Sequence, residues 1–241
     1  AVKKYYLSTG ALVASMLIVA ITFISYYQPS VHDVSDLSHN LMLQAQLTDS
    51  HNTGLSTSLI TWVQDYSFAI VYAWLIGSLL FFIKFLGGFI YLRRIVRDAV
   101  PGTDKLTSIL KRINKKYRIN RTILIKESIK ITTPMVIGYL KPVILFPIGL
   151  AAQLSVSEVE AIIAHELAHI KRHDYILNMF QIIAESIFYF HPAVWYISSR
   201  IRHEREHCCD DMAIKATNST MSYARTLIKL QELNIKNIQP A

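Results

Sequence analysis

Two histidines separated by three residues, the first followed directly by a glutamate, form the run His165-Glu166-Leu167-Ala168-His169. Residues four positions apart lie on one face of a helix, so both imidazoles can face one cation, and neutral imidazole is a good zinc ligand. Glu166 then lies beside the metal without binding it, where a carboxylate can take a proton from a water molecule whose pKa the metal has lowered to about 7. We therefore predict metal-assisted hydrolysis, with one Zn2+ per chain, His165 and His169 as metal ligands and Glu166 as a catalytic residue. The alternative is a pair of ordinary surface histidines.

A catalytic zinc site needs a third protein ligand and an open fourth position. The only other dense group of ligand types in the sequence is the run 202–211, and Glu206 is the predicted third metal ligand. Asp210, four residues further on, lies on the same helical face and is expected to hold a ligand histidine in the correct tautomer. Asp174 is placed in the same supporting role. His203, three residues before Glu206, is predicted to be catalytic by donating to the developing oxyanion, with a structural or surface histidine as the alternative.

Two adjacent cysteines, Cys208 and Cys209, lie within the same run. A structural zinc site built from cysteine and histidine is therefore a competing interpretation. However, two adjacent thiols cannot easily chelate one ion, and the sequence has no second cysteine pair to complete a set. Neighbouring cysteines also form a disulfide only with strain. We therefore predict that both are small buried residues in a reducing compartment.

The histidine pair should lie on a regular helix. The run 155–158 fits a capping box, in which Ser155 and Glu158 each satisfy a backbone donor that is otherwise unpaired at the helix start. The apolar face of this helix is supplied by residues at helical spacing, namely Val159, Ile162, Ile163 and Leu167.

The path between the two ligand segments cannot be a straight helical hairpin. His169 lies 22 residues before His191 and Glu206 lies 15 residues after it, so a straight hairpin would misalign the two ligands by about 10 Å at about 1.5 Å per residue. The break is predicted at residues 173–174, where Asp174 can cap a new helix.

The segment before the capped helix mixes helix and strand patterns. A helix is predicted at residues 103–116 and a short strand at 122–126. One or two strands follow at 135–146, broken by Gly138 and Pro142, and the proline should keep this region at a sheet edge. The predicted fold class is α+β: transmembrane helices followed by a mainly helical zincin-type metallopeptidase domain with a small β-sheet.

The apolar run Met135-Val136-Ile137 predicts where a substrate would bind. A peptide that adds to a sheet edge is held in the uniform extended conformation that a protease needs. We therefore expect substrate along residues 135–140. An ordinary edge strand packed on the helix layer is the alternative.

Two apolar segments are long enough to cross a bilayer. Residues 5–27 carry no charge over 23 positions, and residues 66–83 carry none over 18 positions before Lys84, whereas a span needs about 20 residues. The first is too long for the apolar part of a signal peptide and lacks a clear cleavage site. We predict retained transmembrane helices at 1–27 and 66–92.

The charge distribution predicts how the chain is oriented. Of the 25 Lys and Arg residues, 22 lie from Arg93 onward and two precede the first span, whereas residues 28–65 carry four Asp and no Lys or Arg. The positive-inside rule then places residues 28–65 in an extracytoplasmic loop and residues 93–241 in a cytosolic domain. Basic residues beside the inner leaflet gain about 1 kcal/mol each from anionic lipid. We therefore expect the net charge of +8 to serve contact with membrane lipid, and we expect no nucleic acid as a partner.

Residues 175–199 are again apolar, but Asn178, Gln181 and Glu185 interrupt them. These polar residues favour a helix that is partly embedded in the membrane surface, or buried against other helices, over a full span. Pro192 suits the first turn of a following helix, which would carry residues 200–216.

Four runs resemble the BlaR/MecR-type integral membrane metallopeptidases, which include the bacterial beta-lactam sensor-transducers. They are KPVILFP at 141–147, EAIIAHELAHIKRHD at 160–174, HPAVW at 191–195 and EREHCCD at 204–210. The likeness covers roughly residues 123–216, and a looser likeness extends through the two preceding spans. Compared with the full pattern, an earlier N-terminal span and a C-terminal penicillin-binding sensor do not appear in these 241 residues, so we do not expect this chain to sense beta-lactams.

This resemblance implies a multi-pass protein of the bacterial inner membrane, with a zinc endopeptidase domain on the cytosolic side. A signal would activate it to cleave a cytosolic transcriptional repressor or itself. The resemblance also implies zinc ligands at His165, His169 and Glu206 and a catalytic Glu166.

Two functions from different classes remain. The first is a membrane-anchored zinc endopeptidase that hydrolyses a peptide bond in a regulatory protein as part of signal transduction, so that its partner is a protein or peptide substrate. The second is a non-catalytic membrane signalling or scaffold protein with a structural zinc site. Glu166 separates the two, because an inert relative has little use for a base between metal ligands.

Overall fold

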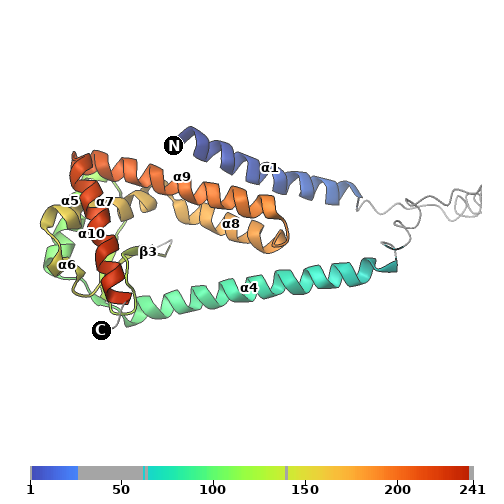
Figure 1. The fold of residues 1–241 in the computed structure, drawn as a ribbon, viewed down its shortest axis with the longest axis horizontal. Coiled ribbons are helices and arrows are strands. Elements are labelled where there is room, and N and C mark those ends of the chain that lie inside the picture. Colours follow the sequence, from blue (N-terminus) through green and yellow to red (C-terminus); the bar gives the residue numbers. More distant parts are fainter. Residues whose placement is uncertain (1, 27–61, 63–64, 139–140, 239–241) are drawn as a thin grey trace, which may run out of the picture. The chain divides into compact units, whose positions relative to one another are not determined.

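The computed structural model describes residues 2–26, 62, 65–138 and 141–238 (Figure 1). The predicted extracytoplasmic loop at 28–65 lies outside the described residues except for positions 62 and 65. The chain divides into two compact units, one of residues 13–80 and one that combines residues 1–12 with 81–241.

The unit of residues 13–80 contains most of α1 (Val2–Tyr26) and the first part of α4 (Ser67–Asp98). Many of their apolar side chains are exposed on the protein, among them Leu17, Ile18, Leu75 and Leu79. By length and composition both helices can cross a membrane. The spans predicted at 1–27 and 66–92 therefore fall on two long apolar helices.

The larger unit is mainly helical with a small mixed sheet, which confirms the predicted α+β class. Its helices after α4 are α5 (Asp104–Tyr117), α6 (Leu150–Gln153), α7 (Val156–Arg172), α8 (Asp174–Ile187), α9 (Pro192–Thr217) and α10 (Thr220–Ile238). Its strands are β1 (Val100–Pro101), β2 (Leu124–Ser128), β3 (Met135–Ile137) and β4 (Val143–Pro147).

The sheet has the strand order β1-β2-β4-β3. β2 and β4 are parallel, and the other two pairs are antiparallel. The expectation that Pro142 keeps its region at an edge is wrong for β4, which lies between β2 and β3 with all five residues buried. Pro142 precedes the first paired residue of β4, so its missing N–H removes no hydrogen bond from the ladder. β3 is the edge strand.

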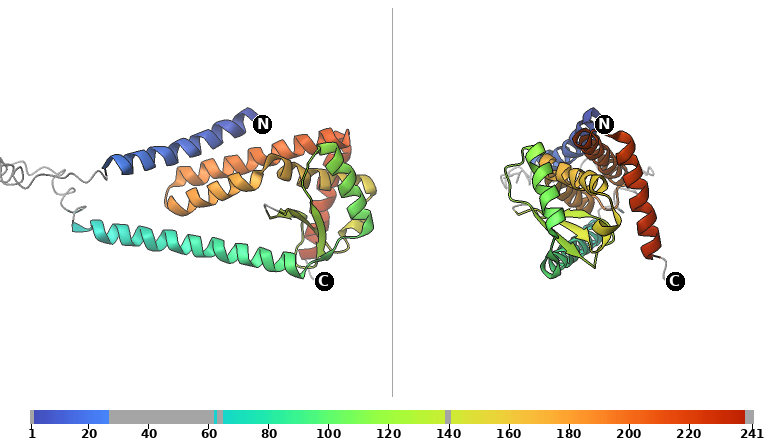
Figure 2. Two further views of the ribbon diagram at one scale, coloured as in Figure 1. Left: turned by 180° about the vertical axis from the view of Figure 1, so that it is seen from behind. Right: turned by 90° about the vertical axis from the view of Figure 1, so that its left-hand side faces the viewer.

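Helix α7 is the centre of the core, in contact with α5, α9, α10 and β3. The right-hand view of Figure 2 shows α5 (green) and α10 (red) on opposite sides of this unit, with α7 and the strands between them. The predicted apolar face of α7 is buried, because Val159, Ile163 and Leu167 are 0% exposed and Ile162 is 5% exposed.

Both ends of α7 agree with the sequence patterns. At the start, the Ser155 side chain accepts a hydrogen bond from the Glu158 N–H at 3.3 Å, and the Glu158 carboxylate accepts one from the Ser155 N–H at 2.7 Å. At the end, His173 has the left-handed φ of 58° and separates α7 from α8. The predicted break is therefore confirmed.

The predicted capping role of Asp174 is wrong. Asp174 is the first residue of α8, and His173 occupies the cap position without a side-chain cap bond. The carboxylate of Asp174 is instead occupied by His169 and Arg172. A side chain that accepts these bonds is directed towards α7 and away from the free N–H groups of α8.

Polar residues of the apolar segment 175–199 join α8 to α9. The Gln181 amide donates to the Ser198 carbonyl at 3.0 Å, and Arg202 forms an ion pair with Glu185 at 2.5 Å. Pro192 occupies the first turn of α9, as predicted. Contact with a neighbouring helix thus accounts for Gln181 and Glu185, whereas Asn178 is exposed, as are Phe180, Phe190 and Tyr196.

Candidate active site

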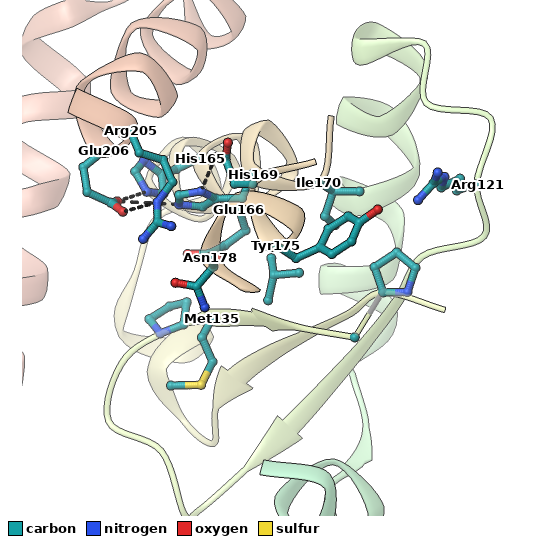
Figure 3. Close-up of a pocket in the computed structure, with 15 residues that line it drawn as sticks. Arg121, Met135, His165, Glu166, His169, Ile170, Tyr175, Asn178, Arg205 and Glu206 are labelled. Carbon is teal, nitrogen blue, oxygen red and sulfur yellow. Dashed lines mark hydrogen bonds and ion pairs between the residues drawn. The ribbon is translucent and has the colours of Figure 1, made fainter. Parts of the chain in front are cut away.

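The three predicted metal ligands meet at one point between two helices. His165 and His169 lie one turn apart on α7, and Glu206 reaches them from α9 (Figure 3). The Oε2 atom of Glu206 lies 3.4 Å from His165 Nε2 and 3.6 Å from His169 Nε2. These three ligand atoms all lie within 4.8 Å of one another, which is the arrangement that one shared cation requires.

Small buried side chains let α7 and α9 approach closely. Ala164 and Ala168 on α7 are 0% exposed, and so are Cys209 and Ala213 on α9. A helix surface of small residues brings the two backbones together, so that a side chain as short as Glu206 can reach the histidines.

Each ligand histidine is held through its other ring nitrogen. His165 Nδ1 lies 3.0 Å from Asp210 Oδ1 and 2.9 Å from the Tyr223 hydroxyl. His169 Nδ1 lies 2.9 Å from Asp174 Oδ2. A proton on each Nδ1 is shared with these acceptors, so each Nε2, on the side of Glu206, is the nitrogen that can bind a cation in place of a proton. Asp210 and Asp174 therefore each lie within hydrogen-bond distance of one candidate ligand histidine.

Nearby carboxylates make this point strongly attractive to positive charge. Burial lowers the pKa of His165, but hydrogen bonds to Asp210 and Glu206 outweigh it and raise the pKa to about 9. Burial likewise lowers the pKa of His169, and contacts with Asp174, Cys209 and Glu206 raise it to about 12. The field that favours a proton on each imidazole also favours a metal cation between them.

Glu206 and Glu166 have opposite electrostatic environments. Burial raises the pKa of Glu206, but its hydrogen bonds to both histidines outweigh burial and lower it well below the usual range, so this side chain is a carboxylate at neutral pH. Glu166 is only 8% exposed, and burial raises its pKa despite the two histidines. A carboxylate with a raised pKa holds a proton more readily, which suits a group that must accept and return one.

The candidate ligands open onto a cleft of about 420 Å3. One side of the cleft is formed by α7, α8 and α9, through residues that include Glu166, Ile170, Tyr175, Asn178 and Arg205 (Figure 3). The edge strand β3 contributes Met135 and Val136 to the opposite side, and Gly138 follows them. The cleft thus joins the three candidate ligands to a sheet edge.

His203 does not line this cleft. Its side chain is exposed, and its Nε2 atom lies 3.0 Å from Nε2 of His207. His203 precedes Glu206 by about 4.5 Å along the axis of α9, which is enough to carry it past the ligands. The neighbour of Glu206 that does line the cleft is Arg205. The geometry therefore gives no support for the predicted catalytic role of His203.

Tyr223 is a site residue that the sequence patterns missed. It lies on α10, is 3% exposed, and donates a hydrogen bond to Asp210 at 2.6 Å. Since its single proton is used there, its oxygen accepts from His165 Nδ1. α10 is tied to α7 by Lys229, whose ammonium group lies 3.0 Å from the Glu158 carboxylate.

Cys209 is also part of the site's support. Both cysteines are free and buried, as predicted. The Sγ atom of Cys209 lies 3.3 Å from His169 Nδ1 and 3.4 Å from Asp174 Oδ2. His169, Asp174 and Cys209 form a second group that could hold a metal. Asp174 and Cys209 are buried away from solvent, so this group lacks the open position of a catalytic metal site.

The described residues combine a group of candidate metal ligands with two long apolar helices. The family model described as BlaR1 peptidase M56 matches residues 2–241, and the chain belongs to this family. The resemblance to BlaR/MecR-type proteins is thereby confirmed.

Two relatives illustrate the extent of the likeness. The regulatory protein BlaR1 of Bacillus licheniformis is 24% identical over 248 residues, which cover 95% of this chain and 40% of that protein. The methicillin resistance mecR1 protein of Staphylococcus aureus is 26% identical over 214 residues, which cover 86% of this chain and 36% of that protein. The chain therefore spans about two fifths of the length of these relatives.

Proposed function

We propose that this chain is a membrane-anchored zinc endopeptidase that hydrolyses a peptide bond in a regulatory protein as part of signal transduction. The observation that carries the proposal is the convergence of His165, His169 and Glu206 in a cleft beside the buried Glu166. In this proposal α1 and α4 span the bacterial inner membrane, residues 28–65 are extracytoplasmic, and the catalytic domain is cytosolic. A transcriptional repressor is the substrate that the resemblance implies.

The donor set fits a catalytic zinc ion. Two imidazole nitrogens and one carboxylate are a usual set for such a site, and the cleft leaves room for a fourth position. When bound, zinc would act as a Lewis acid that polarises the scissile carbonyl and lowers the pKa of a water molecule at the site to about 7.

The chain's own residues then have separate tasks. Glu166 accepts the proton of the attacking water and returns it to the amine nitrogen that leaves when the peptide C–N bond breaks. Asp210 and Tyr223 hold the ring of His165 in position, and Asp174 does the same for His169.

The edge strand β3 is proposed to bind the substrate. Among the described strands β3 pairs only with β4, so its other edge is available for an added strand. Met135 and Val136 line the same cleft as His165, which brings a peptide on this edge close to the candidate ligands. Of the predicted substrate strand 135–140, residues 139–140 lie outside the described residues.

Gly138 gives a test of this strand. It has a φ of 93°, and an added Cβ would lie 2.9 Å from the Lys141 carbonyl oxygen. Gly138→Ala should therefore displace the end of β3 and lower kcat/KM by about 10- to 100-fold, because a small misplacement of bound substrate is costly. The measurement is steady-state cleavage of a peptide substrate.

Gly149→Ala is the matched control for this substitution. Gly149 also has a positive φ, of 79°, but an added Cβ would meet nothing within 4 Å, and the residue does not line the cleft. Each variant should lose about 1 to 2 kcal/mol of stability from the left-handed conformation. Equal kcat/KM values for the two variants would show that β3 does not bind substrate.

One observation favours the second candidate function, a non-catalytic signalling protein with a structural metal. In the group of His169, Asp174 and Cys209, the last two side chains are buried, as the ligands of structural metal sites usually are. This group uses Nδ1 of His169, whereas the cleft group uses Nε2. Because either group could hold a metal, metal binding alone does not separate the two candidate functions. Only catalysis does.

The test compares protein N-termini in cells that carry the wild type or Glu166→Gln. The substitution leaves all proposed metal ligands in place, so a scaffold function would be the same in both strains. The proposed peptidase predicts new N-termini in a regulatory protein, or in the chain itself, only in wild-type cells given the activating signal. Identical N-termini in both strains under every condition that activates the pathway would favour the scaffold.

A further inference from the structure

We propose that Tyr5, in the second turn of α1, is a positioning residue for the metal ligand His169, acting through Arg172 and Asp174. The first turns of the apolar helix α1 would then help to hold a ligand of the candidate metal site in position. This inference rests on the proposed function, because it concerns the regulation of the same site.

One face of the first turns of α1 is packed on the protein. Tyr5 is 8% exposed and Leu12 is 2% exposed, whereas Tyr6 and Leu7 between them are 67% and 76% exposed. Positions seven residues apart lie two turns apart on the same side of a helix. Residues 1–12 also belong to the same compact unit as residues 81–241. The start of α1 is therefore docked on the unit that carries the candidate site.

Arg172 connects this docked face to the metal site. Its guanidinium carbon lies 4.6 Å from the centroid of the Tyr5 ring. Its Nε donates to Asp174 Oδ1 at 3.2 Å, and the other oxygen of Asp174 lies 2.9 Å from His169 Nδ1. A continuous series of contacts thus joins α1 to a proposed zinc ligand.

The chemistry of arginine explains why the ring matters. A guanidinium is planar, so it can stack a face on an aromatic ring while its edge donates to a carboxylate. The guanidinium of Arg172 lies over the Tyr5 ring while its Nε reaches Asp174, so loss of the ring would free it to leave this position. Asp174 is 4% exposed and has little water to replace this partner. The orientation of Asp174 in turn decides how firmly His169 is held.

A regulatory consequence follows from the order of the chain. α1 leads directly into residues 28–65, which the proposed topology places outside the membrane. A signal that displaces α1 would move the Tyr5 ring from Arg172 and loosen the support of His169. Zinc affinity would therefore respond to events at the other end of a membrane helix.

The experiment measures the zinc dissociation constant of the full chain in lipid nanodiscs, by competition with a fluorescent chelator. Tyr5→Leu keeps an apolar side chain but removes the ring, so zinc affinity should fall by about 2- to 30-fold, the range of a cation–π contact. Tyr5→Phe keeps the ring but loses the hydroxyl, and should bind zinc more tightly than Tyr5→Leu. Tyr6→Leu makes the same change at the exposed neighbouring position, whose ring meets the Tyr5 ring edge-on at 5.4 Å, and should weaken zinc binding less than Tyr5→Leu does.

A double-mutant cycle separates positioning from simple anchoring of α1. Arg172→Lys keeps the charge but loses the planar group, and should weaken zinc binding by about 10- to 100-fold. Tyr5→Leu should add little in that background, because both changes break the same series of contacts. Thermal unfolding of each variant identifies any loss of folded protein.

Two results would overturn the inference. If Tyr5→Leu lowers the unfolding temperature but the folded protein binds zinc as tightly as the Tyr6→Leu control, Tyr5 only anchors α1. If Tyr5→Leu and Arg172→Lys weaken zinc binding additively, Tyr5 does not act through Arg172. A wild-type chain that binds no zinc would overturn the proposed function, and this inference with it.

Discussion

Glu166→Gln should leave the chain folded and loaded with zinc while cleavage falls by about 100- to 10,000-fold, the usual contribution of a positioned proton acceptor. The amide has nearly the same shape as the carboxylate, and no proposed metal ligand is altered. The amide cannot accept the proton of the attacking water, so the chemical step is lost. The measurement is the single-turnover rate on a substrate identified by comparison of N-termini.

Glu160→Gln is the matched control for this variant. Glu160 lies on the same helix, forms an ion pair with Arg112 and does not line the cleft. Its substitution should leave the cleavage rate unchanged. A Glu166→Gln protein that keeps more than a tenth of the wild-type rate would show that another group accepts the proton.

Glu206→Gln should lose zinc together with activity. The strongly lowered pKa of Glu206 means that its negative charge is present at neutral pH, and the amide removes that charge from between two histidines. Removal of a residue that only supports a ligand lowers metal affinity by about 10- to 100-fold. The loss of zinc affinity in Glu206→Gln should be larger. The measurement is chelator competition on the purified chain.

Asp211→Asn is the control on the same helix. Asp211 is exposed and does not line the cleft, so this variant removes a nearby negative charge without touching the proposed ligands. Zinc affinity should match the wild type. If Glu206→Gln and Asp211→Asn bind zinc equally well, the third ligand is not Glu206.

Local patterns account for the geometry of the site on which the sequence and the structure agree. The four-residue spacing of His165 and His169 depends only on the helical repeat, and the capping box at 155–158 depends only on hydrogen bonds within one turn. The break at His173 follows from rise per residue, because the two ligand segments cannot meet on straight helices. Each inference uses distances along one or two helices and needs no knowledge of the whole fold.

The residues that the sequence did not predict are brought to the site by packing. Tyr223 lies 58 residues after His165 and reaches it only because α10 folds back against α7. Cys209 was expected as a small buried residue, and burial alone does not reveal that its sulfur touches His169. His203 lies on nearly the same face of α9 as Glu206. How far the cleft reaches along α9, however, depends on the elements that pack against this helix. Helical spacing carries no information about those neighbours.

Zinc content per chain tests the central claim most directly. The wild type, Glu166→Gln and Glu206→Gln proteins would be purified side by side, dialysed against a weak chelator and analysed for zinc by elemental analysis. If His165, His169 and Glu206 bind the metal and Glu166 acts on the proton, the first two proteins should carry about one zinc ion each. Glu206→Gln should then carry far less than one. Equal loss of zinc in both variants would contradict the assigned roles, and full zinc content in Glu206→Gln would place the metal elsewhere.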